Sequence, residues 1–293
     1  MESPDVPPRA AGQPHNVFTV DLEEWFHVCG AGGVLAPENW DRLPSRIERT
    51  TQILLELLHE AGVPATFFTV GWVAARHPGL IARIREAGHD VGSHGYAHQR
   101  AYDLGPDGFR ADLRASVAAL AAAGVDRVSG YRAPEWSVNE RSLWALGILA
   151  EERFTHDASM APLKLVGDTS YPRLPHRRQT AAGSLVELPP FVVDRFGQVM
   201  PMGWGWGLRM SSPLRIIRAV SDANRRGMPA VFTVHPWELD DDPPRVRLSP
   251  RLHFAHYFRL AGFRDRLREV LRQVPFSRMS NLLQGANQLE PIR

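Results

Sequence analysis

The segment NVFTVDLEEW, residues 16–25, joins an apolar, β-branched run to three acidic side chains. Such a run predicts a buried strand over Asn16–Leu22. In an extended chain, side chains two positions apart share a face, so Asp21 and Glu23 would point together. Glu24 would face the other side unless the strand has already turned, and it stays a second candidate. A solvated acidic loop explains the same residues about equally well. The choice between the two interpretations therefore depends on the other segments of the sequence.

Segments typical of strands and of helices alternate along most of the chain. The expected strands are Asn16–Leu22, Ala65–Val70, Asp90–Ser93, Val128–Arg132, Phe154–Asp157, Ser184–Val193 and Ala230–His235. The expected helices are Pro44–Ala61, His77–Ala87, Pro106–Ala123, Asn139–Leu149, Ser212–Arg226 and Phe254–Leu271. This order predicts an α/β fold in which parallel strands form one sheet or barrel.

Composition shifts divide the chain into three parts. Residues 1–15 are polar and rich in proline, and we expect a flexible N-terminal segment. Residues 16–240 carry the alternation and form the main domain, interrupted by an irregular stretch at 158–183. Residues 241–293 show helical patterns and no strand, which predicts a C-terminal helical extension packed on the main domain.

Composition also limits the kinds of site and partner. The 293 residues are 44% hydrophobic and 23% charged, as in a globular protein with a sizeable core. The net charge is only +2 and the basic residues form no block, which argues against a nucleic-acid partner. Cys29 is the single cysteine, so any metal ion has to be held by His, Asp or Glu.

No segment predicts export or membrane insertion. Residues 1–15 lack the apolar core of a secretory signal, and no run reaches the ~18 apolar residues of a membrane span. We therefore expect a cytoplasmic protein without a transmembrane segment.

Histidines follow the third predicted strand, in the segment GSHGYAH at residues 92–98. His94 and His98 can converge on one metal ion if the segment turns tightly, which its two glycines favour. Zinc accepts His nitrogen and carboxylate oxygen as ligands. Two surface histidines are the alternative interpretation.

An arginine and a third histidine follow two other strands, in GYRAPEW at residues 130–136 and TVHPWE at residues 233–238. Arg132 could hold a carboxylate in a bidentate pair, or form a surface ion pair. His235 suits a general acid or base near neutral pH, or it could be a core histidine with satisfied hydrogen bonds.

Together these segments resemble the polysaccharide deacetylases with a NodB homology domain, the carbohydrate esterase family 4 type. HGYAH resembles the family's His-x-x-x-His metal motif, YRAP resembles its Arg-x-Pro motif, and the strand ending at His235 resembles its last motif. FTHDAS, residues 154–159, resembles the segment that supplies an Asp partner to the catalytic His. The resemblance implies a distorted (β/α) barrel as the catalytic domain, over residues 16–240. The tail resembles the branch found with exopolysaccharide and exosortase gene clusters.

The sequence departs from the family pattern at three places. The family has two adjacent aspartates, whereas Leu22 follows Asp21 here, so the ligand role moves to Glu23. Gly95 replaces a Ser or Thr inside the metal motif. Glu135 stands where an aromatic residue commonly follows the proline.

The resemblance implies metal-assisted amide hydrolysis with a role for each matching residue. Glu23, His94 and His98 would hold a divalent ion, and zinc is the one we expect. Asp21 would take a proton from the attacking water, held and kept ionised by Arg132. His235 would protonate the leaving amine, oriented by Asp157.

Several aromatic residues are candidates for stacking on sugar rings. Trp136, Trp204, Trp206 and Trp237 are these candidates, and we group Glu135 with them as a substrate-binding residue. For the run GWGWG at residues 203–207, core packing at a turn is equally compatible with the sequence.

The function expected from the resemblance is removal of N-acetyl groups from an N-acetyl-hexosamine exopolysaccharide, with release of acetate. An N-acetylated glycan is then the partner, and an exopolysaccharide assembly system could associate the protein with the membrane. One alternative is a hydrolase of a cyclic amide or ureide on the same scaffold, and another is a non-catalytic carbohydrate-binding relative.

Overall fold

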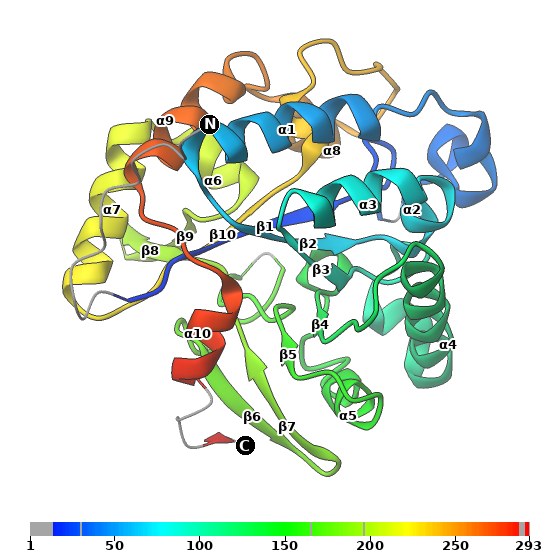
Figure 1. Ribbon diagram of the computed structural model, residues 1–293, viewed down its shortest axis with the longest axis horizontal. Helices are drawn as coiled ribbons and strands as arrows, with labels where there is room; N and C mark the ends of the chain where they lie inside the picture. Colours follow the sequence, from blue (N-terminus) through cyan, green and yellow to red (C-terminus); the bar gives the residue numbers. More distant parts are fainter. Residues whose placement is uncertain (1–13, 30, 165, 196, 287–290, 293) are drawn as a thin grey trace.

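A single curled sheet forms the centre of the protein (Figure 1). The computed structural model describes residues 14–29, 31–164, 166–195, 197–286 and 291–292. Nine strands lie in the order β10-β1-β2-β3-β4-β5-β7-β6-β11, and every neighbouring pair is parallel except β6 and β7. The strands are β1 (Val17–Leu22), β2 (Ala65–Thr69), β3 (Asp90–Ser93), β4 (Gly130–Tyr131), β5 (His156–Asp157), β6 (His176–Thr180), β7 (Gly183–Glu187), β10 (Val231–Val234) and β11 (Pro291–Ile292). The sheet curls into a half-barrel, which confirms the predicted distorted (β/α) barrel.

Helices connect the strands and cover the sheet (Figure 1). The α-helices are α1 (Ile47–Ala61), α2 (Gly71–Arg76), α3 (Pro78–Glu86), α4 (Ala101–Ala122), α5 (Trp144–Glu151), α6 (Gly205–Met210), α7 (Pro213–Arg225), α8 (Pro250–Tyr257), α9 (Phe263–Gln273) and α10 (Met279–Ala286). Four short 3-10 helices are η1 (Gly33–Leu35), η2 (Pro37–Arg42), η3 (Pro134–Trp136) and η4 (Pro236–Leu239). None of the helices in the described part of the chain is long and apolar enough to cross a membrane.

Strand β1, which lies next to the edge strand β10, is buried along its whole length. Parallel strands covered on both faces are apolar almost throughout, which explains the run of residues 16–20. Phe18 and Val20 belong to the main core together with Leu54 of α1 and Ile216 of α7. The acidic residues that follow β1 are therefore fixed to a rigid element.

Two predicted boundaries differ from the structure between β5 and β10. The stretch 158–183, predicted to be irregular, contains β6. The single strand predicted over Ser184–Val193 is divided into β7 and β8 (Val192–Arg195), and β8 pairs with the unpredicted β9 (Gln198–Pro201). Pro189 and Pro190 lack the backbone N–H that a continuous ladder needs, so the strand ends there.

The C-terminal residues pack on the rest of the protein. Helix α9 contacts α1 and α7, and α10 contacts β1. The prediction that this part lacks strands is wrong, because β11 extends the sheet by pairing with β6. Residues 1–13 of the expected N-terminal segment lie outside the described residues, and the boundary between residues 240 and 241 stays a prediction.

Candidate metal centre and active site

The polar residues predicted from the motifs gather at the carboxyl ends of the parallel strands, where α/β sheets carry their sites. Asp21 lies at the end of β1 and Glu23 follows it. His94 and His98 follow β3, Arg132 follows β4, and His235 follows β10. The structure brings all six together, with five of them buried and His235 partly exposed.

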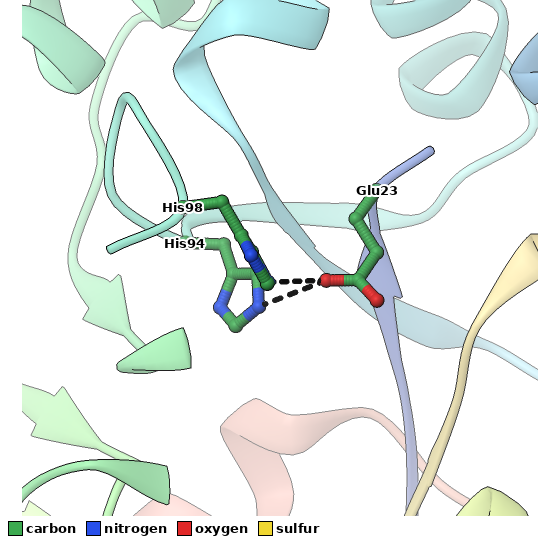
Figure 2. A group of neighbouring side chains, drawn as sticks. All are labelled: Glu23, His94 and His98. Atoms are coloured by element: carbon green, nitrogen blue, oxygen red, sulfur yellow. Dashed lines mark ion pairs between the residues drawn. The ribbon is translucent and has the colours of Figure 1, made fainter. Parts of the chain in front are cut away.

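Glu23, His94 and His98 form a compact set of ligand atoms. The three atoms lie within 4.8 Å of one another. Figure 2 shows the Glu23 carboxylate facing both rings, with Oε2 at 2.5 Å from Nε2 of His98 and 3.6 Å from Nε2 of His94. Nδ1 of His94 donates to the carbonyl oxygen of Arg132 at 2.8 Å, which leaves the lone pair on Nε2. Two nitrogens and one carboxylate oxygen fit a catalytic zinc site with an open position.

Electrostatics support an anionic carboxylate in this set. Burial alone would raise the pKa of Glu23, but His98 and His235 outweigh that effect and hold the pKa well below its usual range. The group can therefore serve as a charged ligand.

Glu24 lies elsewhere. Its carboxylate accepts hydrogen bonds from the Ser45 hydroxyl and from the backbone N–H groups of Arg46 and Ile47, the latter two at 3.0 and 3.2 Å. These contacts hold it at the start of α1, where the helix dipole favours a negative charge. Of the two glutamates, the structure places Glu23 beside the histidines.

The loop carrying the two histidines is shaped by Asp112 of α4. No sequence motif marked Asp112 as a residue of the site. Asp112 accepts the backbone N–H of Tyr96 at 2.8 Å and of Ala97 at 2.9 Å. Gly95 has a φ of 71°, and a Cβ there would lie 2.7 Å from Oδ2 of Asp112. The departure from Ser or Thr at Gly95 is thus explained by a left-handed turn packed against a carboxylate.

Asp21 and Arg132 form a buried ion pair. Nη1 of Arg132 donates to Oδ1 of Asp21 at 2.8 Å and to the Thr19 hydroxyl at 2.8 Å. Nε of Arg132 donates to the Ala158 carbonyl at 3.1 Å. The pair is single rather than bidentate, and Oδ2 of Asp21 remains directed to His235, with 3.9 Å to Nε2.

His235 has a carboxylate on each side of its ring. Nε2 lies 3.7 Å from Oε1 of Glu23, and Nδ1 lies 3.0 Å from Oε2 of Glu238. Burial alone would lower the pKa of His235, but Glu23 and Glu238 outweigh that effect and raise the pKa to about 9. The ring is therefore protonated at neutral pH in the metal-free protein.

The prediction that Asp157 orients His235 is wrong. Asp157 lies on β5, which four strands separate from β10 in the sheet. Its Oδ1 accepts the Ser159 hydroxyl at 2.5 Å. Burial raises the pKa of Asp157 to about 6, and burial and the Asp157 charge raise the pKa of Glu187 well above its usual range. These two carboxyl groups pair with each other instead.

A cavity of about 550 Å³ opens onto this group. Trp136 and Trp204 line it, with ring centroids 4.5 Å apart. Neither buried indole Nε1 has a hydrogen-bond partner among the residues that the structure describes. Glu135 also lines the cavity and pairs with Nε of Arg100 at 2.7 Å. Both indole N–H groups are enclosed by protein, so the two rings contribute apolar surface to the cavity wall.

Trp237 has a different place from the one predicted. His235 stacks on it at 5.2 Å and His256 at 4.4 Å, so no sugar ring can stack on Trp237 without displacing an imidazole. Its indole N–H donates to Oε1 of Glu23 at 3.0 Å. Trp237 therefore orients the candidate ligand Glu23.

The GWGWG run is explained by close packing around each glycine. A Cβ at Gly205 would overlap the carboxylate of Glu238, and one at Gly207 would overlap the Pro201 carbonyl oxygen. Trp206 donates to the carbonyl oxygen of Ala255 at 3.2 Å. Residues 251, 252 and 254–256 on α8 line the cavity as well, so the C-terminal part contributes a wall that sequence reasoning missed.

Comparisons with known proteins agree with this geometry. A family model described as "Polysaccharide deacetylase" matches residues 39–149, and "Domain of unknown function (DUF3473)" matches residues 158–284. The peptidoglycan-N-acetylglucosamine deacetylase of Bacillus cereus is 31% identical over 101 residues, which are 32% of this chain and 35% of that relative. The match thus spans about a third of the curated relative.

Two solved structures share the fold over nearly the whole chain. One, from Mycobacterium smegmatis and assigned as a polysaccharide deacetylase, is 24% identical with a TM-score of 0.65, covering 97% of this chain and 94% of that one. The other, PuuE allantoinase, is 18% identical with a TM-score of 0.60, covering 98% and 96%.

The half-barrel carries a Glu-His-His cluster at its strand ends, and its fold is similar to that of these two solved structures. Residues 39–149 of the chain match the polysaccharide deacetylase family.

Proposed function

We propose that the protein removes N-acetyl groups from an N-acetyl-hexosamine unit of an exopolysaccharide and releases acetate. The observation that carries this proposal is the combination of Asp21, His235 and the Glu23-His94-His98 set around one aromatic cavity. The similarity to the peptidoglycan-N-acetylglucosamine deacetylase of Bacillus cereus supports an N-acetylglucosamine unit as the substrate class.

Glu23, His94 and His98 would hold a divalent ion, and their nitrogen and oxygen donors favour zinc. When bound, the ion supplies Lewis-acid polarisation and makes water a nucleophile near neutral pH.

Asp21 and His235 carry the proton steps. Oδ1 of Asp21 is held by Arg132, so Oδ2 is the atom that accepts the proton of the attacking water. Water adds to the acetamide carbonyl carbon, and the C–N bond then breaks. Nε2 of His235 donates a proton to the departing nitrogen, so that acetate and a free amino sugar leave.

The aromatic wall supports a glycan substrate. Trp136 and Trp204 line the cavity, and indole rings pack well on the apolar faces of sugars. Glu135 lies on the same wall and can accept a sugar hydroxyl.

The test is acetate release from chitooligosaccharides and partly acetylated glucosamine polymers by protein reconstituted with zinc. We expect release together with about one ion per chain by elemental analysis. Turnover of allantoin without acetate release would favour the cyclic-amide alternative, which the same metal ligands and base would serve. Glycan binding without a metal ion or turnover would instead indicate a non-catalytic relative.

A further inference from the structure

We propose that Glu238, held by Arg209, is the positioning residue for His235. Because Arg209 also binds the end of α8, this helix is then part of the catalytic centre. The proposal rests on the proposed role of His235 as a proton donor. Glu238 ends the segment that carries His235 but was assigned no role from the sequence, and Arg209 lies outside every motif quoted above.

Glu238 is enclosed and has a partner for each oxygen. Its side chain is 1% exposed. Oε2 accepts both the backbone N–H and the Nδ1–H of His235, each at 3.0 Å. Oε1 forms an ion pair with Nε of Arg209 at 2.9 Å. The carboxylate packs against Gly205, where any Cβ would overlap it. The local sequence therefore reserves space for this group.

The contact at Nδ1 fixes the direction of the ring. Because Nδ1 donates to Glu238, Nε2 has to face Asp21 and Glu23 across the cavity, at 3.9 and 3.7 Å.

Arg209 ties this pair to the C-terminal part. Its Nη1 donates to the carbonyl oxygen of Phe258 and its Nη2 to that of Ala255, both at 2.8 Å. These acceptors belong to the last turn of α8 and the residue after it, where helix carbonyls lack intrahelical partners. One guanidinium thus satisfies the end of α8 and neutralises Glu238.

The same helix supports the metal set. His256 of α8 stacks on Trp237, whose indole N–H holds Glu23. Displacement of α8 would therefore disturb both the proton donor and a candidate ligand.

The first experiment separates protonation of the leaving group from other defects. In Glu238→Gln we expect kcat for acetate release from chitooligosaccharides to fall about 10²-fold, with KM within about twofold. Hydrolysis of 4-nitrophenyl acetate should stay within about threefold of wild type, because nitrophenolate leaves without a proton. Glu238→Asp should recover part of the loss. Glu152→Gln, which removes a carboxylate paired with Arg110 and Arg114 outside the site, is the matched control.

Equal losses on the two substrates, or no loss on either, would overturn the proposal. Far-UV circular dichroism and zinc content confirm that each variant is folded and loaded. Should the wild type release acetate from no glycan, the proposed function fails, and a second measurement still decides the positioning role.

That measurement is ¹⁵N-histidine NMR of the zinc-loaded protein. We expect a downfield, slowly exchanging Nδ1–H signal that His235→Gln removes. Glu238→Gln should abolish it and Arg209→Met should weaken it, while Asp157→Asn leaves it in place. Persistence of the signal in Glu238→Gln would disprove the contact.

Discussion

The loops after β3 and β10 each present an imidazole to the same cavity, but they give its Nδ1 atom different acceptors. Nδ1 of His94 donates to a backbone carbonyl at 2.8 Å, whereas Nδ1 of His235 donates to the Glu238 carboxylate at 3.0 Å. A carbonyl fixes the tautomer that leaves a lone pair on Nε2, as a metal ligand requires. A carboxylate favours the protonated ring, and the pKa of His235 is raised to about 9. The acceptor behind the ring thus distinguishes the proposed ligand from the proposed proton donor.

Removal of the ligand histidine should have the largest effect. In His94→Ala we expect metal content to fall below about a tenth of an ion per chain and acetate release to fall about 10³-fold, because one of three ligands is lost. Elemental analysis and an acetate assay measure both. His77→Ala, which removes a partly buried histidine paired with Glu48 outside the site, is the control. Wild-type metal content in His94→Ala would refute the ligand assignment.

Loss of the proton acceptor should be nearly as severe but should spare the metal ion. The amide in Asp21→Asn cannot accept a proton as the carboxylate does, so we expect kcat to fall about 10²- to 10³-fold. Zinc content should remain at the wild-type level, since Asp21 is not one of the three residues in the Glu23-His94-His98 set. Steady-state kinetics at matched zinc loading test this. If acetate release were as fast as in the wild type, Asp21 would not be the base.

The Trp136–Trp204 pair should affect substrate binding and leave the chemical step at the two loops nearly unchanged. In Trp136→Ala we expect KM for chitooligosaccharides to rise about fivefold with kcat within about threefold, because ring packing is worth about 1 kcal/mol. Trp144→Phe, whose indole N–H donates to the Arg141 carbonyl away from the cavity, is the control. A change confined to kcat would argue against a role in holding the substrate.

The smallest effect is expected at His156, which is buried without a carboxylate beside it. Its pKa is shifted in the opposite direction from that of His235, so acid should reduce its contribution to the stability of the fold. Burial lowers the pKa of His156 to about 4. The unfolded chain then binds the proton more readily, so the stability due to neutral His156 is present above about pH 6.5 and is lost as pH falls toward 4. Between pH 7 and 4.5, urea unfolding of His156→Leu should lose about 2 kcal/mol less free energy than the wild type. Parallel losses in both proteins would contradict the sign.

Features that depend on residues close together in the chain could be predicted from the sequence. The strand of residues 16–22 and the spacing of His94 and His98 follow from nearby residues, and the structure brings these groups together as expected. The pairing of β11 with β6 joins segments more than a hundred residues apart, so no local pattern could predict it.

The same reason explains the missed parts of the site. Arg209 meets carbonyl groups 46 and 49 residues away, and an arginine in a short helix carries no signal for such contacts. The partner of His235 lay three residues from it in the chain, but choosing Glu238 over Asp157 required knowing that η4 turns back on the histidine. Stacking on Trp237 was excluded only by the two imidazoles that cover its faces.

The sheet order has a consequence for modularity. The segment matched as a domain of unknown function contributes β7 beside β5 and β10 beside β1. Its strands therefore lie on both sides of β2, β3 and β4, which belong to the segment matched as polysaccharide deacetylase. A protein cut between residues 149 and 158 would leave both fragments with open strand edges and an incomplete core. The cut would also part His235 from Asp21 and Glu23, so neither fragment would carry the whole candidate site.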